Sequence, residues 1–369
     1  MEIPEPTLLS LHPGWSDLDP VHKQVNKLHS MKTTAVALLV LGAAILAGCT
    51  APKSDVVVQD PDATGTQTGD YCDQFQSQGQ DQIDQDGSST VYPIAEVWAE
   101  TFGNCLNLHF VVAFACTGGG FKKFCAGSID VSDASRPITN AELSDCTRNG
   151  INPFEVQVAI DGLAVVVSRQ NTFVDYFTVT ELNKIWTAVG SKQVSRWSDV
   201  RAGWPNQPID LYGPGTDSGT FDYWREVIIR PFDGSTANPR NDFTPSEDDE
   251  ILVQGVAQNQ HTLGYFGIAY VEHNQDKIRA VPVKPDTLDG GKTTNASAEP
   301  VEPTPENVIA NKYKPLSRPL FMYTNGKPTG RLLEYFKLGI GPQGQDLVGG
   351  VGYIKLPADK LAAMKAKIG

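Results

Sequence analysis

Three times along this chain a short loop of glycine and hydroxyl residues leads into a helical pattern. The loops occupy residues 86–93 (DGSSTVYP), 116–122 (CTGGGFK) and 212–220 (YGPGTDSGT). Each places backbone N–H groups and Ser or Thr hydroxyls at the start of a helix, where unpaired amides and the helix dipole attract anions. A single loop of this kind is commonly only a helix cap. Three in one chain favour a site in which neutral donors hold a tetrahedral oxyanion.

A fourth segment adds a positive charge to this pattern. Residues 130–138 (DVSDASRPI) hold small residues around Arg136, which precedes Pro137 and is therefore biased towards an extended backbone. A guanidinium group can bind two oxygens of an anion side by side. The alternative is a surface arginine at a turn. Because the three loops accompany it, Arg136 is predicted to contact the anion.

The order of apolar and polar segments predicts an α/β fold. Helix-like stretches separate short apolar runs that are typical of buried strands, an alternation that favours largely parallel sheets. A chain of 369 residues has room for two lobes. The predicted strands are 106–115, 162–168, 209–213 and 319–324. The predicted helices are 92–102, 119–125, 180–187, 219–229 and 248–259, and the Pro- and Thr-rich segment 284–305 is predicted to be an exposed excursion.

The charge of the chain excludes some classes of partner. Acidic side chains outnumber basic ones by 43 to 30, which gives a formal net charge of -13. Binding to nucleic acid or to an anionic membrane surface needs a cationic face, so neither is expected. A single buried anion responds to local hydrogen bonds and nearby charges, so the total charge does not exclude it.

The beginning of the chain predicts export and a lipid anchor. Residues 35–47 are apolar but too few to span a bilayer, and they fit the core of a signal peptide. The ending Leu46-Ala47-Gly48-Cys49 resembles the lipobox of bacterial lipoproteins, in which the cysteine is lipidated. A short buried helix with a chance cysteine is the alternative. Residues 1–30 are predicted to be an upstream extension, 31–48 the signal peptide and 49–70 a flexible tether.

Export permits disulfides among the remaining cysteines. Those are Cys72, Cys105, Cys116, Cys125 and Cys146, an odd number. A bridge from Cys125 to Cys146 is favoured because the intervening segment is rich in loops, while the pairing of the other three stays open. No cysteine pair has CxxC spacing, and the nearby His109 alone cannot complete a zinc site. We therefore expect no metal and no cofactor.

Catalytic interpretations of the third loop find little support. Asp217-Ser218-Gly219 resembles the nucleophile region of chymotrypsin-like proteases, but the residues expected around the catalytic histidine are missing. A phosphate-ester hydrolase with Ser218 as nucleophile would need a positioned base or metal. Neither this loop nor residues 290–293 has the spacing of a nucleotide P-loop. The sequence predicts a binding protein and not an enzyme.

With these residues in view, the chain resembles the phosphate-binding lipoproteins of bacterial phosphate-specific ABC transporters, in particular the branch common in cyanobacteria. The resemblance runs from about residue 82 to the C-terminus through the motifs DGSSTVYPI, TGGGFKKFC, SDASRPI, GPGTDSGTFDYW, LGYFGIAYV and PLSRPLFMYTN. It implies an α/β fold of the two-lobed periplasmic-binding-protein type II, with phosphate in the cleft between the lobes. Lobe 1 would comprise 71–167 and 319–369, and lobe 2 would comprise 168–318. The implied partners are a permease and an ATPase subunit, and we expect a monomer.

The same resemblance assigns the ligand-binding residues. They lie in the three loops and in the arginine segment, and they are Ser89, Thr90, Val91, Thr117, Ser135, Arg136, Ser218, Gly219 and Thr220. Many members have an arginine shortly before Ser-Gly-Thr, where this chain has Gly213-Pro214-Gly215. Arg136 is a candidate to replace that charge from the opposite lobe.

A second departure concerns the choice between phosphate and sulfate. Many members carry an aspartate where Ser135 stands, and that carboxylate accepts the proton of hydrogen phosphate, which sulfate lacks. Asp133 or Asp217 is a candidate acceptor here, and Asp217 is alternatively the partner that holds Arg136. The sequence does not choose between them. A binding protein for sulfate or molybdate, a phosphate sensor and a hydrolase are the alternative functions.

Overall fold

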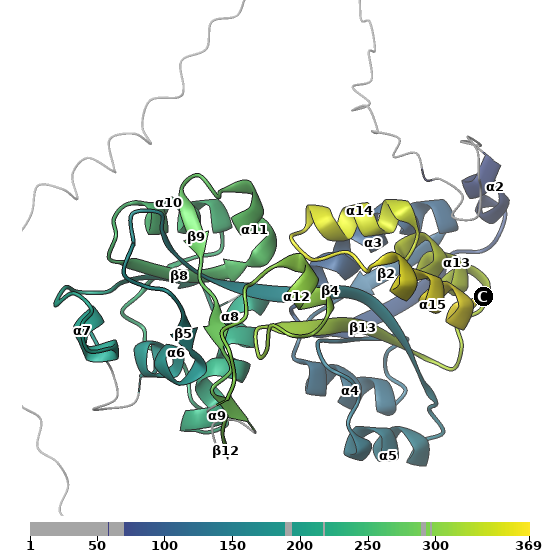
Figure 1. Ribbon diagram of the computed structural model, residues 1–369. Coiled ribbons are helices and arrows are strands. Elements are labelled where there is room, and N and C mark those ends of the chain that lie inside the picture. Colours follow the sequence, from purple (N-terminus) through teal and green to yellow (C-terminus); the bar gives the residue numbers. More distant parts are fainter. Residues whose placement is uncertain (1–57, 59–69, 189–193, 217, 289–292, 296) are drawn as a thin grey trace, which may run out of the picture. The chain divides into compact units, whose positions relative to one another are not determined.

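The computed structural model describes Val58 and residues 70–188, 194–216, 218–288, 293–295 and 297–369 (Figure 1). The predicted extension, signal peptide and lipidation residue Cys49 lie outside the described residues, as do most of the predicted tether and Asp217. Within the described ranges, every helix is too short or too polar to cross a membrane.

The helices follow the strands along most of the described chain. In chain order they are α2 (Asp70–Gln76), α3 (Tyr92–Leu106), α4 (Thr117–Cys125), α5 (Asn140–Arg148), α6 (Val179–Trp186), α7 (Trp197–Val200), α8 (Gly219–Trp224), a π-helical turn (Arg225–Ile229), α9 (Arg230–Asp233), α10 (Asp249–Ala257), α11 (Ile268–His273), α12 (Pro305–Ile309), α13 (Gly330–Gly339), α14 (Pro342–Gly350) and α15 (Ala358–Ile368).

The strands are short except for two in the middle of the main sheet. They are β1 (Asp81–Gly87), β2 (Leu108–Val112), β3 (Val131–Ala134), β4 (Pro153–Ser168), β5 (Phe177–Thr178), β6 (Asp210–Pro214), β7 (Thr244–Ser246), β8 (Thr262–Gly267), β9 (Ile278–Ala280), β10 (Val283–Lys284), β11 (Thr287–Leu288), β12 (Thr293–Thr294) and β13 (Ser317–Asn325).

The main sheet is parallel at its two ends and antiparallel in the middle. Its order is β2-β1-β3-β13-β4-β8-β6-β7, and β9 also pairs with β4. The groups β2-β1-β3 and β8-β6-β7 are parallel, whereas β13 and β4 run antiparallel to each other and to their outer neighbours. The expectation of largely parallel sheets is therefore wrong for the centre. The physical reason is that β4 carries the chain one way along the sheet and β13 carries it back (Figure 1).

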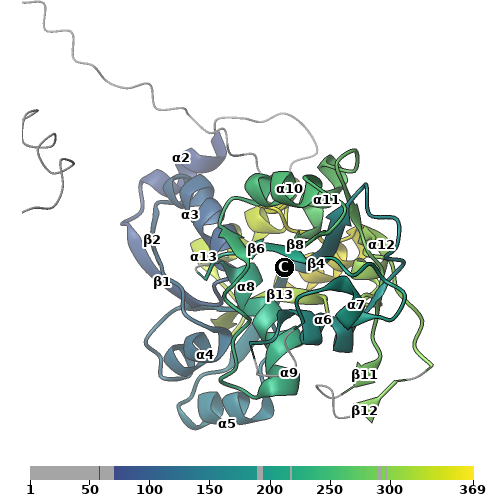
Figure 2. The same ribbon diagram turned by 90° about the vertical axis from the view of Figure 1, so that its left-hand side faces the viewer.

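The protein has two apolar cores, and the boundary between them lies within strand β4. The first core includes Ala159 and contains residues from β1–β3, α3 and α13–α15. The second begins at Ile160 and contains residues from α6–α12, β5, β6 and β8–β10. We call the elements around the first core, together with α2, α4 and α5, lobe 1, and those around the second lobe 2. A smaller apolar cluster lies under α4 and α5. Figure 2 shows these two helices on the opposite side of β1 from α3.

The outer strand of lobe 1 is shorter and more exposed than predicted. The apolar run 106–115 was expected to be one buried strand, but α3 extends to Leu106 and β2 covers only Leu108–Val112. Val111 and Phe114 are 44% and 56% exposed. An edge strand has a neighbour on one side only, so apolar composition alone does not bury it.

Other predicted elements shift at their ends. The predicted helix 219–229 is an α-helix only to Trp224 and continues as the π-helical turn. The predicted excursion 284–305 contains the short β11–β12 ladder, and most of its described residues are half-buried. Both differences arise from tertiary packing, which local composition does not encode.

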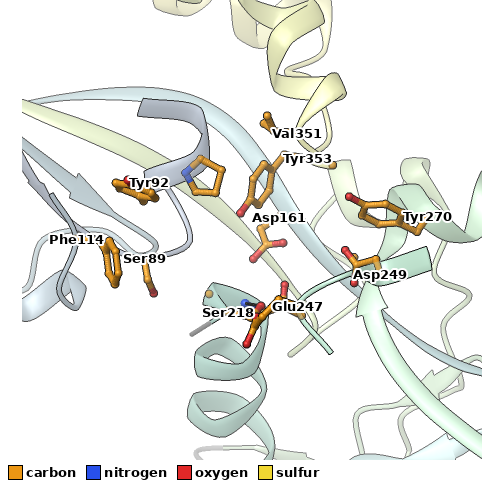
Figure 3. Close-up of a pocket in the computed structure, with 15 residues that line it drawn as sticks. Ser89, Tyr92, Phe114, Asp161, Ser218, Glu247, Asp249, Tyr270, Val351 and Tyr353 are labelled. Atoms are coloured by element: carbon orange, nitrogen blue, oxygen red, sulfur yellow. Dashed lines mark hydrogen bonds between the residues drawn. The ribbon is translucent and has the colours of Figure 1, made fainter. Parts of the chain in front are cut away.

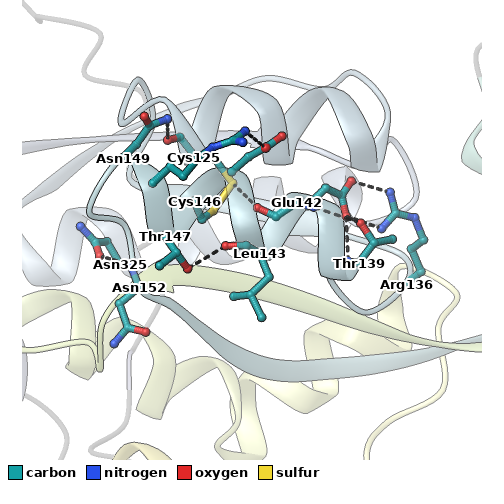
Figure 4. Close-up of a disulfide and its surroundings, with 12 residues drawn as sticks. Cys125, Arg136, Thr139, Glu142, Leu143, Cys146, Thr147, Asn149, Asn152 and Asn325 are labelled. Carbon is teal, nitrogen blue, oxygen red and sulfur yellow. Dashed lines mark hydrogen bonds and ion pairs between the residues drawn. A yellow bond between two sulfur atoms is a disulfide. The ribbon is translucent and has the colours of Figure 1, made fainter.

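Both disulfides of the described residues are in lobe 1. The favoured bridge between Cys125 and Cys146 is present and joins the end of α4 to α5 (Figure 4). The pairing that the sequence left open is Cys72 with Cys105, which ties α2 to α3. Cys116, the first residue of the second loop, is a free, exposed thiol.

Candidate functional site

The first loop leaves strand β1 through a glycine that no other residue could replace without strain. Gly87 has φ +146°, and a Cβ there would lie 2.2 Å from the carbonyl oxygen of Asp133. The next residue, Ser88, donates its N–H to that same carbonyl at 2.9 Å. The chain then turns into α3, with Thr90 and Val91 buried. This loop is therefore anchored to the end of β3.

The second loop and the segment after β3 meet the first loop at one edge of the sheet. Thr117, at the start of α4, shares a 3.0 Å hydrogen bond between its hydroxyl and that of Ser135, and its Oγ1 also accepts the Ser135 N–H. Gly120 packs so closely that a Cβ would lie 2.6 Å from Cα of Gly87. The carboxyl ends of the parallel strands β1, β2 and β3 thus bring three predicted segments together, at the edge where α/β sheets commonly bind ligands.

The third loop comes from lobe 2 and touches the first. Ser218 caps α8 by accepting the N–H of Thr220 at 3.1 Å. A Cβ on Gly219 would lie 2.7 Å from Cα of Thr90, so only glycine permits this approach. The Thr90 hydroxyl lies 3.3 Å from the Gly219 carbonyl oxygen, and Ser89 Oγ lies 3.3 Å from Asp222 Oδ2.

A cavity of about 290 Å³ opens beside this contact (Figure 3). The predicted residues that line it are Ser89, Ser218, Gly219 and Thr220. The predicted residues that do not line it are Thr90, Val91, Thr117, Asp133, Ser135 and Arg136. Tyr92 and Phe114 form part of its wall and contact each other edge to face at 4.9 Å.

Three carboxylates that the sequence analysis did not single out also line this cavity. They are Asp161 of β4, Glu247 and Asp249, and Figure 3 shows them converging from different elements. Burial, followed by the negative charge of Asp248, raises the pKa of Asp249 to about 6. Burial also raises the pKa of Asp161, although the neighbouring Arg318 acts in the opposite direction. The cavity therefore combines neutral donors with groups that accept protons.

Arg318 of β13 contacts the first loop directly. Its Nη2 donates to Thr90 Oγ1 at 2.7 Å, and its Nε and Nη1 donate to Asp161 and Glu226, both at 3.2 Å. Its side chain is only 10% exposed. A buried acidic residue within the apolar stretch of β4 was the sequence signal for this pair, because a charge in such a strand needs a partner.

Arg136 is paired with a carboxylate of its own lobe. Both of its terminal nitrogens bond the carboxylate of Glu142, at 2.8 and 2.9 Å, and its guanidinium lies near the Phe121 ring (Figure 4). Glu142 raises the pKa of Arg136, and the arginine and Thr139 hold the pKa of Glu142 below its ordinary value despite the opposing effect of burial. Asp217, the suggested alternative partner of Arg136, lies outside the described residues.

Asp133 is buried inside lobe 1. Its Oδ1 accepts from Gln85 Nε2 at 2.8 Å, and its Oδ2 has no hydrogen-bond partner among the described residues. Burial raises the pKa of this carboxyl well above its ordinary value. The protonated form of the Asp133 carboxyl is therefore favoured. This group lies at the end of β3, next to the first loop.

Comparison with known proteins places this architecture in a family. A family model described as a PBP superfamily domain matches residues 74–341. This chain belongs to the PBP superfamily. Its two-lobed type II fold, in which the ligand cleft lies between the lobes, is the one predicted from the sequence. No cluster of metal-ligating side chains occurs among the residues that the structure describes.

The relatives include cyanobacterial and staphylococcal proteins. Protein SphX of Synechocystis is 40% identical over 302 residues, which cover 79% of this chain and 85% of that protein. The phosphate-binding protein PstS of Staphylococcus saprophyticus is 34% identical over 295 residues, with the same two coverages. A crystal structure of a possible phosphate-binding protein from Planctomyces limnophilus is 43% identical and has a TM-score of 0.70. The match covers 79% of this chain and 98% of that protein. The predicted resemblance is confirmed.

Proposed function

We propose that this chain binds inorganic phosphate outside the cytoplasmic membrane and delivers it to an ABC permease. The observation that carries the proposal is the contact between Thr90 of lobe 1 and Gly219 of lobe 2, which brings hydroxyl-rich loops of both lobes together. A ligand gripped by both loops would favour the closed arrangement of the lobes, since its contacts exist fully only there. Release to a permease then requires only that the lobes separate.

The proposed ligand donors are neutral. Hydroxyls of Ser89, Thr90, Thr117, Ser135, Ser218 and Thr220 and backbone amides near Val91 and Gly219 form the set. Hydrogen bonds to a charged acceptor are roughly twice as strong as those between neutral groups, so uncharged donors suffice for an anion. Arg136 would add a charged donor to these neutral ones only if its guanidinium exchanged Glu142 for the anion.

Selection against sulfate needs an acceptor for the proton of hydrogen phosphate. Asp133 is our proposed acceptor, because its Oδ2 is buried, unpartnered and adjacent to the first loop. Burial raises the pKa of Asp133, so this carboxyl accepts the phosphate proton only when it is itself ionised, whereas a protonated Asp133 would donate to the anion and would not exclude sulfate. Asp217 is the alternative acceptor.

Calorimetric titration of the ligand-free protein with phosphate and then sulfate tests the proposal. We expect tight 1:1 phosphate binding that excess sulfate does not disturb. Thr220→Val should weaken phosphate binding roughly ten- to a hundred-fold, because it removes a donor to a charged ligand. Thr147→Val is the matched control, since that hydroxyl bonds only the Leu143 carbonyl on an exposed face of α5. Equal affinity for both anions would make this a general oxyanion-binding protein.

The proposal includes an anchor at Cys49 and the lobe boundaries predicted from the sequence, 71–167 with 319–369 and 168–318. Mass spectrometry of the protein from its membrane fraction tests the anchor. We expect a lipid-modified N-terminal cysteine at position 49, and Cys49→Ser should release the protein from the membrane. An unprocessed chain that still carries residues 31–48 would contradict the proposal.

A further inference from the structure

The guanidinium of Arg318 bonds to both lobes at once. Strand β13 places Arg318 directly across from Asp161 of β4, between the two cores. From there one nitrogen donates to Thr90 in the first loop, at 2.7 Å, and another donates to Glu226 in the π-helical turn of lobe 2, at 3.2 Å. The third contact, from Nε to Asp161, holds the base of the group.

An aromatic ring fixes the plane of this guanidinium. The carbon Cζ of Arg318 lies 3.5 Å from the centre of the Tyr223 ring, a stacking contact that orients the planar group. Tyr223 follows Thr220 by three residues on α8, and its own hydroxyl donates to the Pro315 carbonyl at 2.7 Å. Arg318 is thus held by the same helix that the third loop begins.

The charges around Arg318 show that it does not supply net positive charge to an anion. It faces two carboxylates, Asp161 and Glu226, so the three groups together carry a formal charge of about -1 when both carboxylates are ionised. Its effect on a bound anion must therefore come through geometry. The group that it touches on the ligand side is the hydroxyl of Thr90.

A threonine hydroxyl has one proton to donate. Because Thr90 Oγ1 accepts the N–H of Arg318, its own proton must point elsewhere, and in this structure it meets the Gly219 carbonyl at the long distance of 3.3 Å. A phosphate oxygen held by the same loops would be a charged and therefore better acceptor. We propose that Arg318 is a positioning residue that locks Thr90 as a hydrogen-bond donor to the bound anion. This inference rests on the proposed function.

A double-mutant cycle on phosphate affinity tests the inference. Thr90→Val and Arg318→Gln should each weaken binding roughly ten-fold, because each removes the oriented donor. If Arg318 acts through Thr90, the double variant should bind about as weakly as Thr90→Val alone, since the cycle exposes the shared effect. Losses that multiply to roughly a hundred-fold would assign Arg318 a separate role and overturn the inference.

Two further variants keep the test decisive. Arg318→Lys keeps the charge but not the planar fork, so it provides a second cycle with Thr90→Val if Arg318→Gln fails to fold. Arg201→Gln is the matched control, because Arg201, like Arg318, is a mostly buried arginine that forms an ion pair and stacks on aromatic rings. It lies in a different place, in a cluster around α6. This variant should leave phosphate affinity unchanged.

Two outcomes separate this inference from the proposed function. If the wild-type protein bound no phosphate, the proposed function would fail. If Arg318→Gln bound phosphate as well as the wild type, only this inference would fail.

Discussion

Helices α5 of lobe 1 and α6 of lobe 2 begin with the same motif but are held in place differently. Each starts with Thr-x-x-Glu, in which the threonine and glutamate cap each other's backbone. In each, an arginine clamps the glutamate with two hydrogen bonds, Arg136 on Glu142 and Arg201 on Glu181. The bodies of the helices differ. The only buried residue of α5 is Cys146, whereas α6 buries Leu182, Ile185, Trp186 and two further residues.

This difference shows how two identical local signals can serve unlike surroundings. Helix α6 lies against the aromatic core of lobe 2, so apolar packing holds it. Helix α5 lies at the periphery of lobe 1, where the disulfide to Cys125 supplies the attachment that its side chains lack. The comparison also concerns the role of Arg136. Its two hydrogen bonds to Glu142 match those of Arg201 to Glu181, an arginine that was not predicted to bind the anion.

The largest effect should come from the core side of α6. Trp186 is fully buried and contacts Trp224, Phe243 and Tyr265 edge to face. Trp186→Ala should lower the free energy of unfolding by about 3–5 kcal/mol through lost burial and the cavity left behind. The matched substitution on α5 is Leu143→Ala, which should cost less than about 0.5 kcal/mol because Leu143 is 42% exposed. Equal losses in chemical denaturation would contradict the comparison.

Removal of the bridge in α5 should have the next largest effect. Replacing both Cys125 and Cys146 by serine should cost about 3 kcal/mol, the usual cost of opening a loop of this length. Hydrogen exchange should accelerate in α4 and α5 while α6 keeps its protection. Cys116→Ser is the control, since that thiol is free. Unchanged exchange in α5 would mean that its few packing contacts suffice.

Removing Arg136 or Arg201 should lower the free energy of unfolding by smaller amounts. Arg136→Gln should cost about 1 kcal/mol, as for a half-exposed ion pair. Arg201→Gln should cost about 2 kcal/mol, because Arg201 is less exposed and also stacks on Tyr176 and Trp204. Phosphate titration of the same variants decides the ligand role of Arg136. Weaker phosphate binding only in Arg136→Gln would make this clamp part of the anion site.

The smallest effect should be a pH dependence at the cap of α5. The pKa of Glu142 is held below its ordinary value of 4.5, so this carboxylate stabilises the folded state above that pH and the contribution is lost as pH falls below it. Glu142→Gln should therefore flatten the loss of stability in acid. Asp145→Asn removes a carboxylate from the same helix but leaves the cap intact. The measurement is the melting temperature between pH 3 and pH 7, and equal slopes for Glu142→Gln and the wild type would exclude the cap as the cause.

Much of the site was predictable because its signals are local. A few neighbouring residues suffice to recognise a loop of glycines and hydroxyls before a helix. The first and third of these loops meet in the structure, and Ser89 and Ser218 line one cavity. Glu247, Asp249 and Arg318 were missed because each is an ordinary charged residue in its own segment, and Asp161 was missed although an acidic residue in an apolar strand is itself a signal. Only pairing across β4 and β13 brings Arg318 to Asp161 and to Thr90.

The sequence by itself determined the α/β class, the phosphate-binding family, the three glycine- and hydroxyl-rich loops before helices and the bridge from Cys125 to Cys146. Those features depend on residue patterns within short stretches or on motifs read together. The tertiary structure alone decided the antiparallel centre of the sheet, the pairing of Cys72 with Cys105, the partner of Arg136 and the position of Arg318. The reason is that each of these features depends on which distant segments of the chain the fold brings together. For the two arginines, the partner is the opposite charge that lies within reach.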